Sequence, residues 1–154
     1  MPTMDETRAA LTPKLVDSLY VEAMLLADEA RAYFDKHGRE DRMGLDPLVR
    51  VGFSCESLKV TTRLMHVIAW LLTQRAVAAG ELTAAQAEKP ERQLGEAVES
   101  DAEVLEKLPE SALALVQSSR DLYERVRRLA EGGSGREAPQ SPARSLLSRL
   151  ERSL

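Results

Sequence analysis

The fold of this chain is decided by residues 51–79, which read VGFSCESLKVTTRLMHVIAWLLTQRAVAA. After Gly52 this stretch contains no glycine or proline, so it predicts one long helix. Helical spacing divides its apolar residues into two stripes on nearly opposite sides. The first stripe has the pattern of a helix that packs in a bundle, and it contains Val51, Cys55, Leu58, Thr62, Met65, Ala69, Leu72 and Ala76. The second stripe contains Val60, Leu64, Val67 and Leu71.

A helix that is apolar on two sides is expected to be buried on two sides. In a chain this short we expect the second cover to come from another copy, because symmetric dimers are the commonest oligomers. We therefore predict a homodimer whose interface is the second stripe, formed by Val60, Leu64, Val67 and Leu71.

A narrow polar strip separates the two stripes on one flank of this helix. Arg63, His66 and Trp70 follow one another along it at intervals of about one turn. Tryptophan and arginine are enriched at interaction hot spots, so these three residues form a candidate partner-binding surface. The alternative is that Trp70 covers a seam between helices of the same chain.

The segment before this helix predicts another one. Thr12 is a good N-cap and Pro13 a good first helical residue, so we expect a helix over about residues 12–37 that ends at Gly38. Its apolar residues recur at spacings of three and four along one stripe, formed by Leu15, Leu19, Ala23, Leu26, Ala30 and Tyr33.

The start of the central helix is marked in the same way. Asp46 and Pro47 repeat the cap signal, which predicts a helix over about residues 46–79 that ends at Gly80. Because Gly52 interrupts its first turns, the helix could instead begin near Ser54.

An acidic connector follows the central helix. Thr83 and Gln86 have the spacing of a capping box for a short helix, which Pro90 then ends or bends. The last long helix is predicted over about residues 109–131, starting at Pro109.

Composition supports a helical fold. The 154 residues include 23 Leu and 20 Ala but only one Ile and one Trp, a mixture that favours helix over sheet. We predict an all-α protein, an antiparallel three-helix bundle (residues 1–131) that dimerises and carries a flexible C-terminal tail (residues 132–154).

The tail ends in an amphipathic pattern. Four leucines, Leu146, Leu147, Leu150 and Leu154, would lie on one face of a short helix, among several arginines. Such a segment on a Gly/Ser/Pro-rich tether is typical of a peptide that folds into a partner's groove. The alternative is a frayed end or a fourth short helix that packs on its own bundle.

Residue types argue against catalysis. One cysteine and two histidines cannot form a disulfide framework or the usual Cys/His zinc site, and we expect no metal and no cofactor. Cys55 on an apolar helix face is expected to be an inert small side chain rather than a nucleophile. Glu22 and Glu29 are expected to form ion pairs with Arg63 or Arg75 across the bundle. We therefore predict that the chain is not an enzyme.

Charge and hydropathy bear on location and partners. No segment has the length of apolar sequence needed to span a membrane, and Asp5 and Glu6 do not fit a signal peptide, so we expect a cytoplasmic protein. The net charge of −4 argues against nucleic acid as a partner. The short basic group Arg125, Arg127 and Arg128 keeps a nucleic-acid-associated or transcriptional helper as the alternative function.

Several motifs resemble one known family, the RcdA family of regulators of CtrA degradation. The most specific is SCESLKVTTRLM (residues 54–65). The others are SLYVEAM (18–24), EARAYF (29–34), AWLL (69–72), QRAV (74–77), the Leu108–Pro109 start and LYERV (122–126).

The resemblance implies an alphaproteobacterial, cytoplasmic, dimeric three-helix-bundle protein without enzymatic activity. It implies the role of an adaptor that helps deliver cell-cycle substrates, including the response regulator CtrA, to the ClpXP protease. In that scheme the family acts beside the receiver-domain protein CpdR and the cyclic-di-GMP-binding adaptor PopA.

Overall fold

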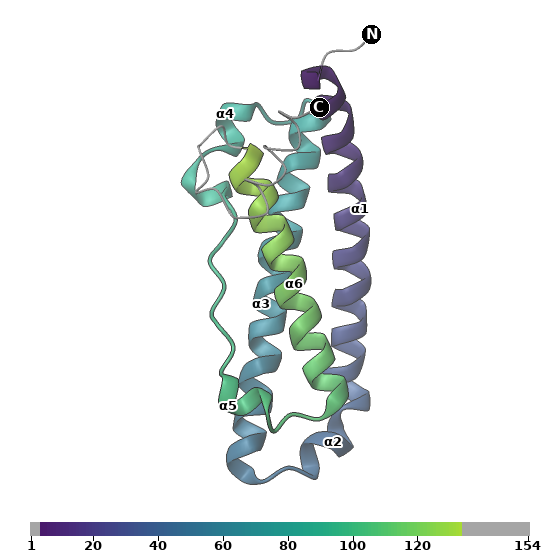
Figure 1. Cartoon of the computed structure of the whole chain (residues 1–154), viewed down its shortest axis with the longest axis vertical. Coiled ribbons are helices and arrows are strands. Elements are labelled where there is room, and N and C mark those ends of the chain that lie inside the picture. The colour runs from purple at the N-terminus through teal and green to yellow at the C-terminus, as the bar shows by residue number, and fades with distance from the viewer. Residues whose placement is uncertain (1–3, 134–154) are drawn as a thin grey trace, which may run out of the picture.

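The computed structural model describes residues 4–133, with side chains described from Thr12 to Gly132, and every regular element in this part of the chain is helical. Three long helices lie side by side (Figure 1). They are α1 (Met4–Ala32), α3 (Pro47–Ala78) and α6 (Glu110–Gly133). Short elements join them, namely η1 (Tyr33–His37), α2 (Arg39–Met43), α4 (Ala84–Ala87), η2 (Pro90–Arg92) and α5 (Ala102–Leu105).

The first helix begins earlier than its cap signal predicts. It starts at Met4, so Pro13 lies inside α1 instead of at its first position. The preceding residues include Glu6, Arg8, Ala9 and Ala10, which are all good helix formers. They continue the helix although Pro13 cannot donate one of its backbone hydrogen bonds.

The helix type changes from α to π directly after α1. Tyr33–His37 forms a π-helical turn, and Gly38 follows as the predicted stop. A Cβ atom at Gly38 would lie 2.8 Å from the carbonyl oxygen of Tyr33, so only glycine fits this close approach. The residues after Gly38 then form the short helix α2, and Tyr33 donates a hydrogen bond of 2.7 Å to Asp41 in that helix.

The central helix starts at its first cap signal. Asp46 is the N-cap of α3 and Pro47 its first residue. The helix continues through Gly52. This residue has no side chain, and Val104 of α5 occupies the space beside it. A Cβ atom at this glycine would approach a methyl carbon of Val104 to 2.7 Å.

The route from α3 to α6 differs from the predicted antiparallel order. The capping box of Thr83 and Gln86 is present at α4. Residues 93–101, which we call the strap, then run in extended form back along α3 (Figure 1). Consequently α6 runs parallel to α3, and only α1 is antiparallel to both. An extended chain rises about 3.3 Å per residue against 1.5 Å in a helix, so a short strap can span many helical turns.

The core contains the stripe of α3 that was predicted to form a dimer. Val60, Leu64, Val67 and Leu71 are at most 3% exposed and pack with side chains of α1 and α6. They are not available as the predicted dimer interface. Periodicity identifies an apolar stripe but does not identify the neighbour that covers it, and here the intramolecular neighbours take this one.

Two adjacent leucines test which stripe is internal. Leu71 is completely buried whereas Leu72 is 45% exposed. We expect Leu71→Ala to lower the free energy of unfolding by about 2–5 kcal/mol, because it leaves a cavity in the core. Leu72→Ala should lower it by less than about 1 kcal/mol. Urea denaturation followed by circular dichroism measures both, and equal losses would contradict this assignment of the two faces.

Candidate protein-interaction face

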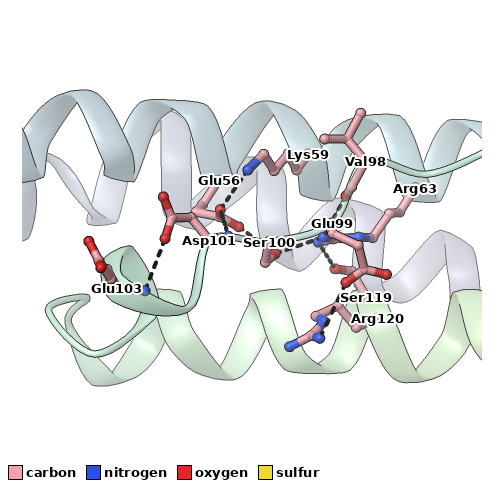
Figure 2. Close-up of polar contacts among 10 residues, drawn as sticks. All are labelled: Glu56, Lys59, Arg63, Val98, Glu99, Ser100, Asp101, Glu103, Ser119 and Arg120. Atoms are coloured by element: carbon pink, nitrogen blue, oxygen red, sulfur yellow. Dashed lines mark hydrogen bonds and ion pairs between the residues drawn. The ribbon is translucent and has the colours of Figure 1, made fainter.

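The strap is fastened to the helices by a buried arginine. Arg63 of α3 is 2% exposed and reaches three partners (Figure 2). Its guanidinium donates to the carbonyl oxygen of Val98 at 3.1 Å, to the hydroxyl of Ser100 at 2.7 Å and to the hydroxyl of Ser119 on α6 at 3.3 Å. One side chain therefore joins the central helix, the strap and the last helix.

A buried carboxylate of α3 completes this attachment. Glu56 is 1% exposed and accepts hydrogen bonds from Ser100 at 2.5 Å, from the Asp101 N–H at 3.1 Å and from Lys59 at 3.1 Å. Ser100 thus lies between the two buried charges, donating to Glu56 while it accepts from Arg63 (Figure 2). We call Glu56, Arg63, Ser100 and Ser119 the latch.

The latch also shifts the titration of its charged groups. Burial raises the pKa of Glu56, but the hydrogen bonds from Ser100, from Asp101 and from Lys59 outweigh burial and hold that pKa below its usual value of 4.5. Burial lowers the pKa of Arg63, and the negative charge of Glu56 opposes this change. Both groups are therefore charged in the folded protein near neutral pH.

The flank predicted to bind a partner is covered by the strap. Arg63 is used in the latch, and His66 lies so close to Gly95 that a Cβ atom there would overlap the imidazole ring. Tyr123 of α6 holds the same point of the strap by donating to the Gly95 carbonyl oxygen at 2.6 Å. Trp70 is half-buried against the core, in line with its alternative role as cover over a seam. Arg63 and His66 thus contact a segment of their own chain, and Trp70 packs against the core.

The free face of α3 is the other stripe, on the side away from the core. Its large members are highly exposed, with Val51 at 61%, Leu58 at 68%, Met65 at 65% and Leu72 at 45%. Cys55 and Ala69 between them are also exposed, and Thr62 is half-buried. We call this surface, formed by Val51, Cys55, Leu58, Thr62, Met65, Ala69 and Leu72, the outer face of α3.

The outer face carries no charge. Each charged side chain of α3 already has a partner within the chain. Glu56 and Arg63 belong to the latch, and Lys59 pairs with Glu56. Arg50 donates to the carbonyl oxygens of Met43 and Leu45, and Arg75 pairs with Asp17 of α1. A solvent-facing side of a helix is normally polar. Extended apolar patches on soluble proteins mark surfaces that bind other proteins or membranes.

The described residues provide few groups that could act in catalysis. They contain no group of three or more His, Cys, Asp or Glu placed to hold a metal ion. Cys55 is exposed on the outer face, away from His66, which lies under the strap. A groove of about 560 Å³ between the strap and α6 is lined by arginines and acids, many of them already paired with each other. None of the described helices is both long and apolar enough to cross a bilayer.

The basic group on α6 is neutralised by neighbouring carboxylates. Arg125 pairs with Glu22 of α1 and with Asp121, Arg127 with Glu124 and Glu131, and Arg128 with Glu124. Glu22 therefore pairs with Arg125, and not with Arg63 or Arg75 as the sequence suggested. Arginines held in such pairs present little net positive charge for nucleic-acid phosphates.

Comparisons with known proteins agree with the motifs. The family described as Protein of unknown function (DUF1465) matches residues 7–154. The crystal structure of RcdA from Caulobacter crescentus CB15 is similar at 42% sequence identity, with a TM-score of 0.61. The alignment covers 76% of this chain and 88% of that one. The chain belongs to the RcdA family. A comparison with curated proteins gives no match for this RcdA-family chain.

Reasoning from the sequence alone assigned the two stripes of this RcdA-family protein to the wrong sides. The spacing could not separate the two stripes, because Val60 and Val67 of the buried stripe are seven residues apart, as are Leu58 and Met65 of the exposed one. The tail leucines Leu146, Leu147, Leu150 and Leu154 lie outside the described residues.

The latch predicts how the strap opens. Ser100→Ala removes one hydrogen bond from each buried charge, which should cost about 1–3 kcal/mol of strap attachment. A glutamyl endopeptidase should then cleave at Glu96 and Glu99 about fivefold faster or more, because cleavage follows the population of the open strap. Ser118→Ala, on the exposed side of α6, is the matched control. Equal cleavage of all three proteins would contradict this role.

Glu56 predicts a pH dependence. A carboxylate whose pKa is lowered on folding stabilises the protein above its unfolded pKa, and this contribution is lost as the pH falls through the folded pKa. Glu56→Gln should therefore be about 1–3 kcal/mol less stable than the natural protein at neutral pH. The difference should shrink as the pH is lowered below about 4.5. Urea denaturation over this range measures it, and a difference that does not change with pH would contradict the assignment.

Proposed function

We propose that this RcdA-family chain is a non-enzymatic adaptor that helps deliver cell-cycle substrates such as the response regulator CtrA to the ClpXP protease. It would act in the cytoplasm, as a three-helix homodimer, and beside CpdR-like and PopA-like adaptors. Membership of the family supports the regulatory role. The uncharged outer face of α3 is the single observation that carries the adaptor function.

The outer face has the properties of a protein-docking surface. It is presented by an uninterrupted helix of 32 residues, Pro47–Ala78, whose opposite side is fixed in the core. Binding to a rigid helix face involves little loss of conformational entropy. Large side chains placed along four successive heptads match the way that one helix packs on another. We assign the binding of protein partners, a second copy included, to this face.

The latch supports the same proposal. It anchors the acidic strap on one flank of α3 by two buried charges, so that flank is closed and the outer face is the open side of the helix. A scaffold that presents an open apolar face on a rigid helix is suited to bringing proteins together.

The proposal is tested by placing charges on the outer face. The double variant Leu58→Asp/Met65→Asp should keep the helical spectrum and melting temperature, because both side chains are more than 60% exposed. It should lose delivery of CtrA to purified ClpXP, by about tenfold or more if each buried aspartate costs over 1 kcal/mol of binding. The readout is the rate of CtrA degradation in the presence of the partner adaptors.

A matched control carries the same added charge elsewhere. Ala114→Asp/Gln117→Asp lies on the exposed side of α6 and should deliver substrate normally. Sedimentation of the Leu58→Asp/Met65→Asp variant reports in parallel whether self-association uses the same face. Unchanged delivery by that variant would refute the assignment of partner binding to the outer face.

A further inference from the structure

A groove of about 260 Å³ lies between α1 and α6. We call it the α1/α6 groove, and its lining includes Glu22, Leu25, Glu29, Ser118, Asp121 and Arg125. Leu25 is 65% exposed, and Val21, one turn earlier on α1, is 55% exposed. Large apolar side chains beside a groove between two packed helices are suited to contact with a third helix.

The α1/α6 groove is distinct from the outer face of α3. Among the described residues, its lining comes from α1 and α6 alone. A homodimer that forms through the outer face of α3 therefore does not use these residues. The groove and that interface can be occupied at the same time.

The groove has an excess of negative charge. Its described lining has the three carboxylates of Glu22, Glu29 and Asp121 but one guanidinium, that of Arg125. This guanidinium is shared, because Arg125 pairs with Glu22 and, at 3.1 Å, with Asp121. Glu29 has no ion pair or hydrogen bond from its side chain within the described part of the chain. The groove thus favours an occupant that is both apolar and positively charged.

Glu29 was expected to pair with Arg63 or Arg75 across the bundle. The structure places Arg63 in the latch and pairs Arg75 with Asp17. The carboxylate of Glu29 consequently remains available at the groove.

The chain itself contains a sequence of the required kind. Residues 144–154 read RSLLSRLERSL, with three arginines and one glutamate, so their side chains carry a charge of +2. In a helix the four leucines form one stripe, and Arg144 and Arg149 lie on its two flanks. Arginines on both flanks match a groove with carboxylates on both walls, Glu22 and Glu29 on α1 and Asp121 on α6. This segment lies outside the described residues, and the match is one of sequence pattern.

The connection is long enough. α6 ends at Gly133, at the end of the bundle where α1 begins (Figure 1). Arg125 is eight residues back along α6, which is about 12 Å. The intervening residues 134–143 can span up to about 35 Å. The segment can therefore reach the α1/α6 groove of its own chain.

From these observations we infer that residues 144–154 bind the α1/α6 groove of the same chain as an additional short helix. The inference does not depend on the proposed function, because it concerns a different surface. A tethered segment is present at an effective concentration of about 1 mM, whatever the protein concentration. The same groove of a second copy would instead bring like charge against this one.

A thiol placed in the groove reports whether it is covered. The full-length variant Cys55→Ser/Ser118→Cys has a single cysteine, which lines the groove. Its rate of reaction with a maleimide depends on access to the thiol, so a covered groove reacts more slowly. The reference variant Cys55→Ser/Gln117→Cys places the thiol on the next residue of α6, which is exposed and does not line the groove.

Adding Leu147→Asn/Leu150→Asn should make the Ser118→Cys thiol react about fivefold faster, which corresponds to a groove covered in about four-fifths of the molecules. Ser145→Asn/Ser148→Asn is the matched control, because it adds the same side chains on the opposite side of the expected helix. It should leave the rate unchanged. The Gln117→Cys thiol should react at one rate in all tail variants.

The charge contribution is tested separately. Glu29→Gln should speed the reaction of the Ser118→Cys thiol about twofold, because it removes one of the carboxylates that attract the tail. Asp28→Asn removes the same charge from the neighbouring residue of α1, which does not line the groove, and should have a smaller effect. Higher salt should speed the reaction relative to the Gln117→Cys thiol.

Equal rates of the Ser118→Cys thiol with the natural tail and with Leu147→Asn/Leu150→Asn would overturn the inference. Protection that rises with protein concentration would also overturn it. If such protection survives the leucine substitutions, a second copy covers the groove by another surface, and if it does not, the tail of a second copy covers it. Protection that depends on the leucines and is independent of concentration supports binding within one chain.

Discussion

The structure depends on the guanidinium of Arg63. It is almost completely buried and its hydrogen bonds reach Val98 and Ser100 in the strap and Ser119 on α6. Two buried charges, Arg63 and Glu56, share Ser100, so neither can leave this position without exposing or orphaning the other. The strap must consequently lie along α3, and this placement makes α6 run parallel to α3.

The latch also determines which surface is open. The strap covers the flank of Arg63 and His66, and Val60 and Val67 face the core, so the side of α3 that lacks a cover among the described residues is its outer face. The charged side chains of this helix all serve the latch, the loop before α3 or α1. Polar contacts within the chain thus leave this apolar surface uncovered among the described residues, and this property supports the proposed adaptor function.

Most of the helical content could be predicted from the sequence. The Asp46–Pro47 cap and the Thr83–Gln86 capping box predicted elements that the structure contains, because these signals act over a single turn. The Thr12–Pro13 signal failed because the residues before it are strong helix formers. The candidate site could be predicted only as a pair of apolar stripes. Which stripe is internal depends on neighbours distant in sequence, such as Leu19 of α1 and Leu122 of α6, which belong to the same core.

The sequence by itself determined that the chain favours helix over sheet and that its motifs resemble those of the RcdA family. Local spacing and residue chemistry are sufficient for those conclusions. Only the tertiary structure decided that Val60, Leu64, Val67 and Leu71 are core, that Arg63 and Glu56 fasten the strap, and that Leu58 and Met65 face solvent. The physical reason is that two opposite apolar stripes are equivalent in hydrophobicity, and long-range packing and buried hydrogen bonds select between them.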